Sequence, residues 1–294
     1  MENFQIDFIG IGFAKSGTTT VAKLLEEHPE ICMSIPKEVQ YFNPIRSFYH
    51  KPLENSNYQK GRHWYQNHWA HQKNERLRGE ISPQYIQSIK SLERIKRDQP
   101  QAKILIFLRN PADITFSFYG MAVHHHHVKI PHFSEAIRTN ENIRERMFLF
   151  SQVKDCINLF PKNQIYFFVL EDFMKDREAA IKSLYEFLGV DTLFKPPSLN
   201  LVFNAAGSSK FPWLRQFENK FVSTLSGLGL TEFLKTLKTW SVIQKIQQLN
   251  TTKHKKHELS IEDRKYIYEE VKNDVKMLET IVGRDLSFWL KMKI

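Results

Sequence analysis

Cysteine is scarce in this sequence, and its scarcity excludes two classes of structure. The 294 residues contain two cysteines, Cys32 and Cys156, which are too few for a disulfide framework or a metal site. No apolar run approaches the roughly 18 residues that cross a bilayer, and the first residues lack the basic and apolar regions of a secretory signal. We therefore expect a reduced, cytoplasmic protein without a transmembrane segment.

Acidic residues are outnumbered by basic ones, which gives a net charge of +10 and an isoelectric point near 9.4. Nucleic acid, an anionic membrane and small anionic ligands all suit such a charge. The densest basic stretch, residues 253–257, is accompanied by no helix-turn-helix, RNA-recognition or zinc-finger pattern. We interpret it as a solvated face and expect no nucleic-acid partner.

Short apolar runs alternate with helical patterns through the first 190 residues, as in a parallel sheet with helices on both faces. The run 104–108 is apolar throughout, which is typical of a central strand buried on both faces. The sequence predicts strands at 7–12, 31–34, 76–80, 104–108 and 165–170, and helices at 19–27, 83–97, 111–123, 143–159 and 178–188.

The alternation stops beyond Asp191. Residues 214–248 are predicted to form amphipathic helices, and Ser260 with Asp263 resembles a capping box at the start of a last helix. We expect that helix to run to about Ile281 and to end at Gly283. The whole chain, 1–294, is predicted to be one domain, with an α/β core in 1–190 and a helical extension in 191–294.

One loop carries the strongest signal in the chain. The apolar run that starts at Phe8 leads into Ala14-Lys15-Ser16-Gly17-Thr18-Thr19-Thr20, and a helical pattern follows. A helix N-terminus favours negative charge, and Gly17 lets the backbone come close to a ligand. Lys15 adds a positive charge, and the hydroxyls of Ser16, Thr18 and Thr19 add donors. An ordinary turn would leave this lysine unexplained, so we expect a phosphate or phosphosulfate ligand.

The position of the lysine argues against an ATPase or GTPase. A nucleotide-hydrolysing P-loop reads G-x-x-x-x-G-K-[ST], with lysine directly after the second glycine. Gly12 and Gly17 have this separation, but Thr18 follows Gly17 and the lysine lies inside the loop.

A second anion site is predicted where the strand 104–108 ends. Arg109 comes at the carboxyl edge of the sheet, where ligands of open α/β sheets bind, and arginine pairs well with phosphate. Ser117 lies about 9 Å along the helix that Pro111 opens. The alternative for Arg109 is an ion pair with Asp113. Two anion sites on one sheet suit a nucleotide bisphosphate.

Together these segments resemble sulfotransferases that use 3′-phosphoadenosine 5′-phosphosulfate (PAPS). The loop at 14–19 resembles their 5′-phosphosulfate loop, and Arg109 with Ser117 resembles their 3′-phosphate site. The resemblance implies a P-loop-like three-layer fold, PAPS as sulfuryl donor and no required metal. The residues it assigns to PAPS are Lys15, Ser16, Gly17, Thr18, Thr19, Thr20, Arg109 and Ser117, with Ser209 and Lys210 in a loop that closes over the donor.

The acceptor side resembles the heparan-sulfate branch of this family. Residues 36–42 (PKEVQYF) match its K/N-E-x-x-[FY]-F segment, which implies that Glu38 is the general base. The alternative is a glutamate paired with Lys37. Residues 79–85 resemble the E-K-[ST]-P-x-Y segment, but Ile81 replaces the lysine, which argues against a highly acidic glycan acceptor.

The run His124–His127 does not predict a metal site, because no carboxylate or cysteine stands at ligand spacing. It is either an exposed loop or a contact to the acceptor. We expect Lys15 and Glu38 to transfer a sulfuryl group to a hydroxyl or amine of a small molecule, glycolipid, secondary metabolite or glycan. Two alternatives stay open: a nucleotide kinase, and a basic nucleic-acid or membrane-binding module on a degenerate nucleotide fold.

Overall fold

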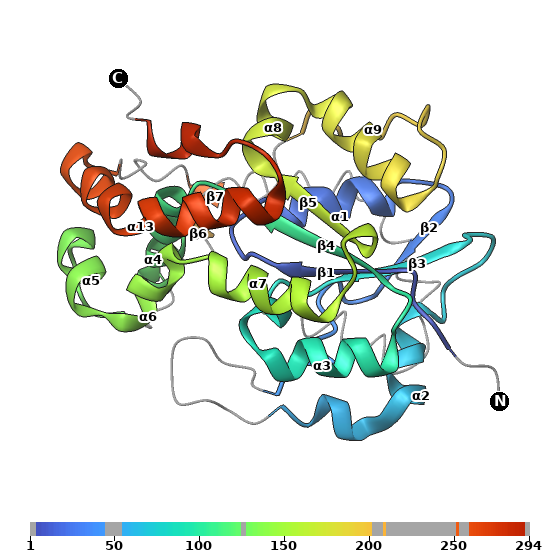
Figure 1. Ribbon diagram of the computed structural model, residues 1–294. Coiled ribbons are helices and arrows are strands. Elements are labelled where there is room, and N and C mark those ends of the chain that lie inside the picture. The colour runs from blue at the N-terminus through green and yellow to red at the C-terminus, as the bar shows by residue number, and fades with distance from the viewer. Residues whose placement is uncertain are drawn as a thin grey trace. The chain divides into compact units, whose positions relative to one another are not determined.

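The computed structural model describes residues 4–44, 55–124, 128–201, 208–209, 251–252 and 259–291. Its centre is a five-stranded sheet in the order β2-β3-β1-β4-β5, with every neighbouring pair parallel (Figure 1). The strands are β1 (Phe8–Gly12), β2 (Ile31–Met33), β3 (Leu77–Ile81), β4 (Lys103–Leu108) and β5 (Ile165–Val169). The predicted α/β fold with a central parallel sheet is confirmed, as are all its predicted strands within one or two residues.

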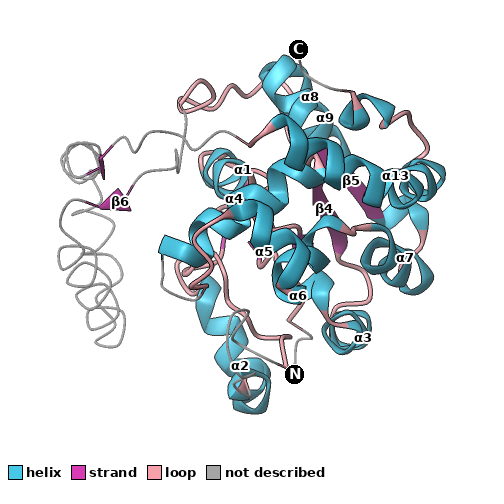
Figure 2. Cartoon of the chain, turned by 90° about the vertical axis from the view of Figure 1, so that its left-hand side faces the viewer, coloured by secondary structure: helices cyan, strands magenta, loops and turns pink. Residues whose placement is uncertain are grey.

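Helices surround the strands (Figure 2). They are α1 (Thr18–Glu26), α2 (Gly61–Gln66), α3 (Ile89–Asp98), α4 (Pro111–His124), α5 (Phe133–Thr139), α6 (Glu141–Arg144), α7 (Phe150–Leu159), α8 (Leu170–Lys175), α9 (Arg177–Leu188) and α13 (Ile261–Val282). The sequence analysis missed α2, α5 and α8. No helix in the described ranges is both long and apolar enough to cross a bilayer.

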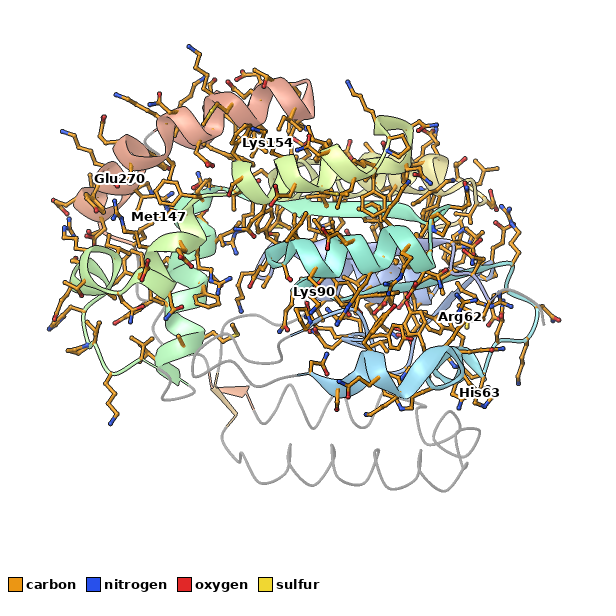
Figure 3. The ribbon with its side chains drawn as sticks, turned by 60° about the horizontal axis from the view of Figure 1, so that its bottom comes forward. Arg62, His63, Lys90, Met147, Lys154 and Glu270 are labelled. Carbon is orange, nitrogen blue, oxygen red and sulfur yellow. The ribbon has the colours of Figure 1, made fainter. Side chains whose placement is uncertain are left out.

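Each face of the sheet carries its own apolar core, because successive side chains of a strand point to opposite faces. Leu105 and Phe107 of β4 belong to the cluster formed with α1 and α9, while Ile104, Ile106 and Leu108 belong to the cluster formed with α3, α7 and α13. Figure 3 shows side chains filling the space between the helices and the sheet. This double burial explains why β4 is an uninterrupted apolar run.

The strand order changes direction between β1 and β4. The connection from β1 leads to β2 on one side of the sheet, whereas the chain proceeds from β4 to β5 on the other side. Ligands of open α/β sheets bind outside the carboxyl ends of the strands at such a point. The loop after β1 and the turn after β4 therefore lie where a ligand is expected.

Two predicted helices were wrong in extent. The helix predicted at 83–97 is a short 3₁₀ turn, η3 (Tyr85–Gln87), followed by α3. The one predicted at 143–159 is divided into the end of α6, the 3₁₀ turn η4 (Glu145–Met147) and α7. The Asp274 carboxylate of α13 accepts hydrogen bonds from the amides of Leu149 and Phe150 and so fixes the start of α7.

The last helix begins and ends as predicted. The Ser260 hydroxyl accepts from the amide of Asp263, and Gly283 ends α13 in the left-handed conformation with φ 74°. By their contacts, Met1–Leu201 with Leu259–Ile294 form one compact unit and Val202–Glu258 a second. In the second unit β6 (Ser208–Ser209) pairs antiparallel with β7 (Thr251–Thr252). The helices predicted at 214–248 lie outside the described residues, and the single-domain organisation stays a prediction.

Candidate active site

The loop after β1 has a backbone that depends on glycine. Gly17 stands directly before α1 with φ 84°, in the left-handed region that favours glycine. A Cβ added to it would come within 2.8 Å of Leu170 Cδ1. Lys15 also has a positive φ, 70°, although it is not a glycine. The loop therefore holds a sparsely populated conformation that presents the first turn of α1 to the sheet edge.

The start of α1 has the features of an anion site. No side chain caps the helix, and its first turn contains no acidic residue. Ser16 is fully buried, and its hydroxyl has no hydrogen-bond partner. A buried donor normally finds a partner, so a ligand with several acceptor oxygens would satisfy Ser16 and the free amides together. A phosphate or phosphosulfate group fits this loop.

Arg109 brings a second cation to the same place. Its Nη1 donates a 2.8 Å hydrogen bond to the carbonyl oxygen of Lys15. Burial, together with the positive charge of Arg109, lowers the pKa of Lys15 from its ordinary value. Among the described residues no carboxylate forms an ion pair with either side chain. The alternative pairing of Arg109 with Asp113 is wrong, because Asp113 instead pairs with Arg264 at 2.9 Å.

The turn that carries Arg109 is held on both sides. The amide of Asn110 donates to Glu171 Oε1 at 2.8 Å, and its side chain donates to the carbonyl oxygen of Trp289 at 2.8 Å. Asn110 Oδ1 accepts from the amide of Ala112 and so caps α4. Sequence analysis could not indicate this role of Glu171, because Asn110 lies 61 residues away from it along the chain.

For the other residues predicted to bind the donor, the structure gives the position in the chain and, where the side chain is described, the burial. Thr18 is buried, Thr19 and Thr20 are half-buried in the first turn of α1, and Ser117 is half-buried on α4. Ser209 lies in β6 without a described side chain, while Lys210, His125–His127 and residues 253–257 lie outside the described residues. His124 is the last residue of α4. The assignments of these residues to PAPS stay predictions.

Glu38 lies in the segment that follows β2. Its Oε1 is 2.9 Å from Lys37 Nζ, which is the ion pair considered above as the alternative, and 37% of its side chain is exposed. Its Oε2 accepts a 3.3 Å hydrogen bond from Gln40 Nε2. A partly exposed pair of this kind contributes little free energy, so an acceptor can displace Lys37 from the carboxylate. The general-base role stays a prediction.

A buried carboxylate to which the sequence analysis gave no role lies behind this segment. Glu80, at the end of β3, is fully buried and accepts hydrogen bonds from Tyr65 at 2.6 Å, Ser82 at 2.8 Å and Tyr85 at 3.1 Å. Burial raises its pKa to about 7, and the hydroxyl donors oppose that rise. The signal in the sequence was the resemblance of residues 79–85 to the E-K-[ST]-P-x-Y segment, in which Glu80 matches the glutamate.

Glu80 makes the stability of the fold depend on pH. Its folded-state pKa of about 7 lies above the ordinary 4.5, so between these values the folded state binds more protons than the unfolded state. This term therefore destabilises the fold as pH rises from about 4.5 to about 7, by about 3 kcal/mol at most. Urea titrations give the free energy of unfolding of the wild type minus that of Glu80→Gln. We expect this difference to be lower at pH 8 than at pH 5 by about 2–3 kcal/mol, because a part of the effect is already lost at pH 5. A difference that does not change with pH would mean that Glu80 ionises as an ordinary glutamate.

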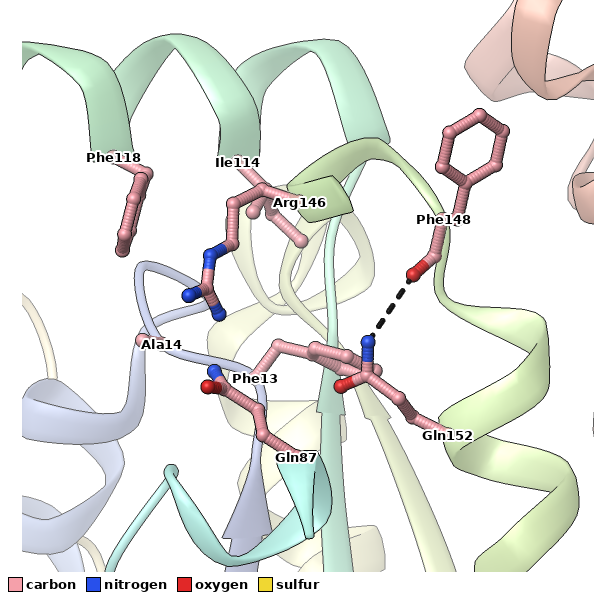
Figure 4. Close-up of a pocket in the computed structure, with 8 residues that line it drawn as sticks. All are labelled: Phe13, Ala14, Gln87, Ile114, Phe118, Arg146, Phe148 and Gln152. Atoms are coloured by element: carbon pink, nitrogen blue, oxygen red, sulfur yellow. Dashed lines mark hydrogen bonds between the residues drawn. The ribbon is translucent and has the colours of Figure 1, made fainter. Parts of the chain in front are cut away.

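A small pocket adjoins the Lys15 loop (Figure 4). The Arg146 and Gln87 side chains extend toward Ala14, the residue directly before Lys15, while Phe118 lies on the α4 side. Gln152 Nε2 donates to the carbonyl oxygen of Phe148 at 3.4 Å. The pocket combines amide and guanidinium groups with aromatic walls, but its volume of about 10 Å³ has room for little more than one water molecule, so it is a polar gap beside the loop and not a ligand site. The sequence analysis missed it, because its residues come from five separate segments.

Comparison with known proteins agrees with this geometry. The family described as the sulfotransferase domain matches residues 5–204. A membrane-associated sulfotransferase, kil1, of Dictyostelium discoideum is 32% identical over 120 residues, which are 40% of this chain and 23% of that protein. The mouse bifunctional heparan sulfate N-deacetylase/N-sulfotransferase 4 is 32% identical over 119 residues, 38% of this chain and 12% of that protein. The chain thus spans less than a quarter of the length of either relative.

A solved structure has the same fold. The sulfotransferase of Alicyclobacillus acidocaldarius superposes with a TM-score of 0.71 at 22% identity, over 98% of this chain and 100% of that one. The family match covers more than half of the present sequence and contains the Lys15 loop, Glu38, Glu80 and Arg109. The chain belongs to the sulfotransferase domain family.

Proposed function

We propose that this protein transfers the sulfuryl group of PAPS to a hydroxyl or amine. The observation that carries the proposal is that Arg109 contacts Lys15 beside the uncapped start of α1, while no carboxylate in the described part of the chain pairs with either side chain. A donor with phosphates at both its 5′ and 3′ positions supplies the negative charge that this arrangement lacks. Lys15 with the loop amides would hold the 5′-phosphosulfate, and Arg109 with Ser117 would hold the 3′-phosphate.

In this proposal each side chain has a separate task. PAPS supplies an activated sulfuryl group. Glu38 takes the proton from the acceptor hydroxyl or amine as that atom attacks sulfur in line with the leaving oxygen. Lys15 and the first amides of α1 stabilise the negative charge on the oxygen that bridges sulfur and the 5′-phosphate. The products are the sulfated acceptor and adenosine 3′,5′-bisphosphate (PAP).

The acceptor we propose is a small molecule, glycolipid, secondary metabolite or glycan without a dense negative charge. The side chain of Ile81 is fully buried in the core with α1, so this position offers no cation to an acidic acceptor. Radiolabelled PAPS offered with phenols, alcohols and amino sugars would identify the acceptor.

Calorimetric titration with PAP and with AMP, in EDTA, tests the donor site. We expect PAP to bind about 10- to 100-fold more tightly than AMP, because hydrogen bonds to charged groups contribute about 1.5–3 kcal/mol. Arg109→Ala should remove this preference. Arg97→Ala is the control, since Arg97 is an exposed arginine paired with its neighbour Asp98. Equal affinities for PAP and AMP in the wild type would refute the bisphosphate site and favour a different nucleotide.

A further inference from the structure

The segment that carries Glu38 has no regular secondary structure. Residues 34–43 follow β2, so other groups must satisfy their backbone hydrogen bonds. The Ser34 hydroxyl lies 2.9 and 3.1 Å from the carbonyl oxygens of Pro36 and Lys37. Gln40 has φ 56°, a left-handed conformation that is rare outside glycine. Such a conformation persists only where its surroundings fix it.

Two hydroxyl oxygens fix the segment at this point. The amide of Gln40 donates to Ser82 Oγ at 3.3 Å, and the amide of Tyr41 donates to Tyr85 Oη at 2.9 Å. Both hydroxyls come from the end of β3 and the turn after it. They therefore join the Glu38 segment to the sheet, in addition to the backbone hydrogen bond that the Ile81 amide of β3 donates to the Lys37 carbonyl oxygen at 3.3 Å.

Glu80 determines which way these hydroxyls point. Ser82 Oγ donates to Glu80 Oε2 at 2.8 Å, and Tyr85 Oη donates to the same carboxylate at 3.1 and 3.2 Å. A hydroxyl has one proton, and an ionised carboxylate can only accept. With both protons directed to Glu80, the hydroxyl oxygens turn their lone pairs toward the amides of Gln40 and Tyr41.

Hydrogen bonds then connect the buried carboxylate of Glu80 to the partly exposed carboxylate of Glu38. Glu80 accepts from Ser82, Ser82 accepts from the amide of Gln40, and Gln40 Nε2 donates to Glu38 Oε2 at 3.3 Å. We propose that Glu80 is a positioning residue, which holds Gln40 in its left-handed conformation and through it orients the Glu38 carboxylate toward the acceptor. The consequence for catalysis rests on the proposed role of Glu38 as the base.

Amide hydrogen exchange, followed by NMR on the full chain at pH 8, tests the structural part of this proposal. Glu80→Gln replaces an acceptor-only group with one that also donates, so one hydroxyl must turn away. We expect the amides of Gln40 and Tyr41 to exchange at least about tenfold faster, because their opening becomes easier, while those of β4 keep their rates. Unchanged exchange at both amides would overturn the proposal.

A second variant tests the same hydrogen bonds without changing the charge of Glu80. Tyr85→Phe removes one hydroxyl and leaves Glu80 in place, and we expect faster exchange at Tyr41. Tyr166→Phe is its matched control, because it removes the tyrosine hydroxyl that donates to Ser183, on β5 and away from the segment. Equal effects of the two variants on Tyr41 would contradict the proposal.

The catalytic part is tested with the acceptor that the PAPS panel identifies. Glu80→Gln should lower kcat by about 10-fold or more and leave the Kd for PAP within about twofold, since the Lys15 loop and Arg109 are untouched. A kcat within about twofold of the wild type, despite faster exchange, would overturn the positioning role. If Glu38→Gln retained activity, the proposed base would be wrong. The exchange rates of Gln40 and Tyr41 would still test whether Glu80 positions the segment.

Discussion

Glu38→Gln should reduce sulfate transfer about 1,000-fold while PAP binds as before. General-base catalysis contributes about 10²–10⁴-fold to rates, and glutamine cannot take the proton of the acceptor. The change preserves the size of the side chain and one acceptor oxygen, so the 3.3 Å hydrogen bond from Gln40 can survive. Initial rates with radiolabelled PAPS give kcat, and calorimetry gives the affinity for PAP.

Glu26→Gln is the matched control for this variant. Glu26 is also a partly exposed glutamate with a nearby lysine, Lys23 at 3.2 Å, but it lies in the last turn of α1 rather than at the acceptor side. We expect its kcat to equal that of the wild type. If Glu38→Gln kept more than about a tenth of the wild-type kcat, the base would have to be another group, such as one of the histidines in 124–127.

Lys15→Ala should lower kcat about 100- to 1,000-fold, more than it weakens acceptor binding. Removing one preorganised group that stabilises developing charge costs about this much in other enzymes. Lys15 already has a lowered pKa because of its burial and Arg109, so losing its charge removes a repulsion in the free protein. We therefore expect an unchanged or slightly raised melting temperature together with the loss of turnover.

Lys23→Ala is the control for Lys15→Ala, because Lys23 lies on α1, the helix that follows the Lys15 loop, and pairs with Glu26. Steady-state kinetics over a range of acceptor concentrations would separate kcat from KM for both variants. A wild-type kcat in Lys15→Ala would remove the lysine from the mechanism. A large fall in melting temperature would show that its role is structural.

Sequence reasoning predicted the sheet because its strands are short apolar runs between turns. It also found Lys15 and Arg109, since an unusual residue type at the end of a strand is visible locally. Sequence reasoning failed where a contact with a residue distant in the sequence overrides the local preference for a helix. Ser82-Pro83 looked like the start of a helix, but the Ser82 hydroxyl donates to Glu80 and accepts from Gln40, so the helix begins at Ile89.

The network around Glu80 could not be derived from local patterns for a similar reason. Tyr65 comes from α2, a helix that the periodicity did not indicate, and Tyr85 lies in a turn that was predicted to be helical. The resemblance of residues 79–85 to the E-K-[ST]-P-x-Y segment includes Glu80, Ser82 and Tyr85, but it does not predict that their side chains meet. Only the fold brings three hydroxyls to one buried carboxylate, and only burial raises its pKa.

The strand order has a consequence for how such a protein can diverge. The groups proposed to hold the donor follow β1 and β4, whereas the Glu38 segment follows β2 and is attached to the end of β3. Donor binding and acceptor activation therefore depend on different loops in this proposal. We therefore expect that exchanging residues 34–43 together with 79–85 between relatives changes the acceptor preference and does not change donor recognition. This half of the sheet is then a suitable unit for building chimaeric enzymes.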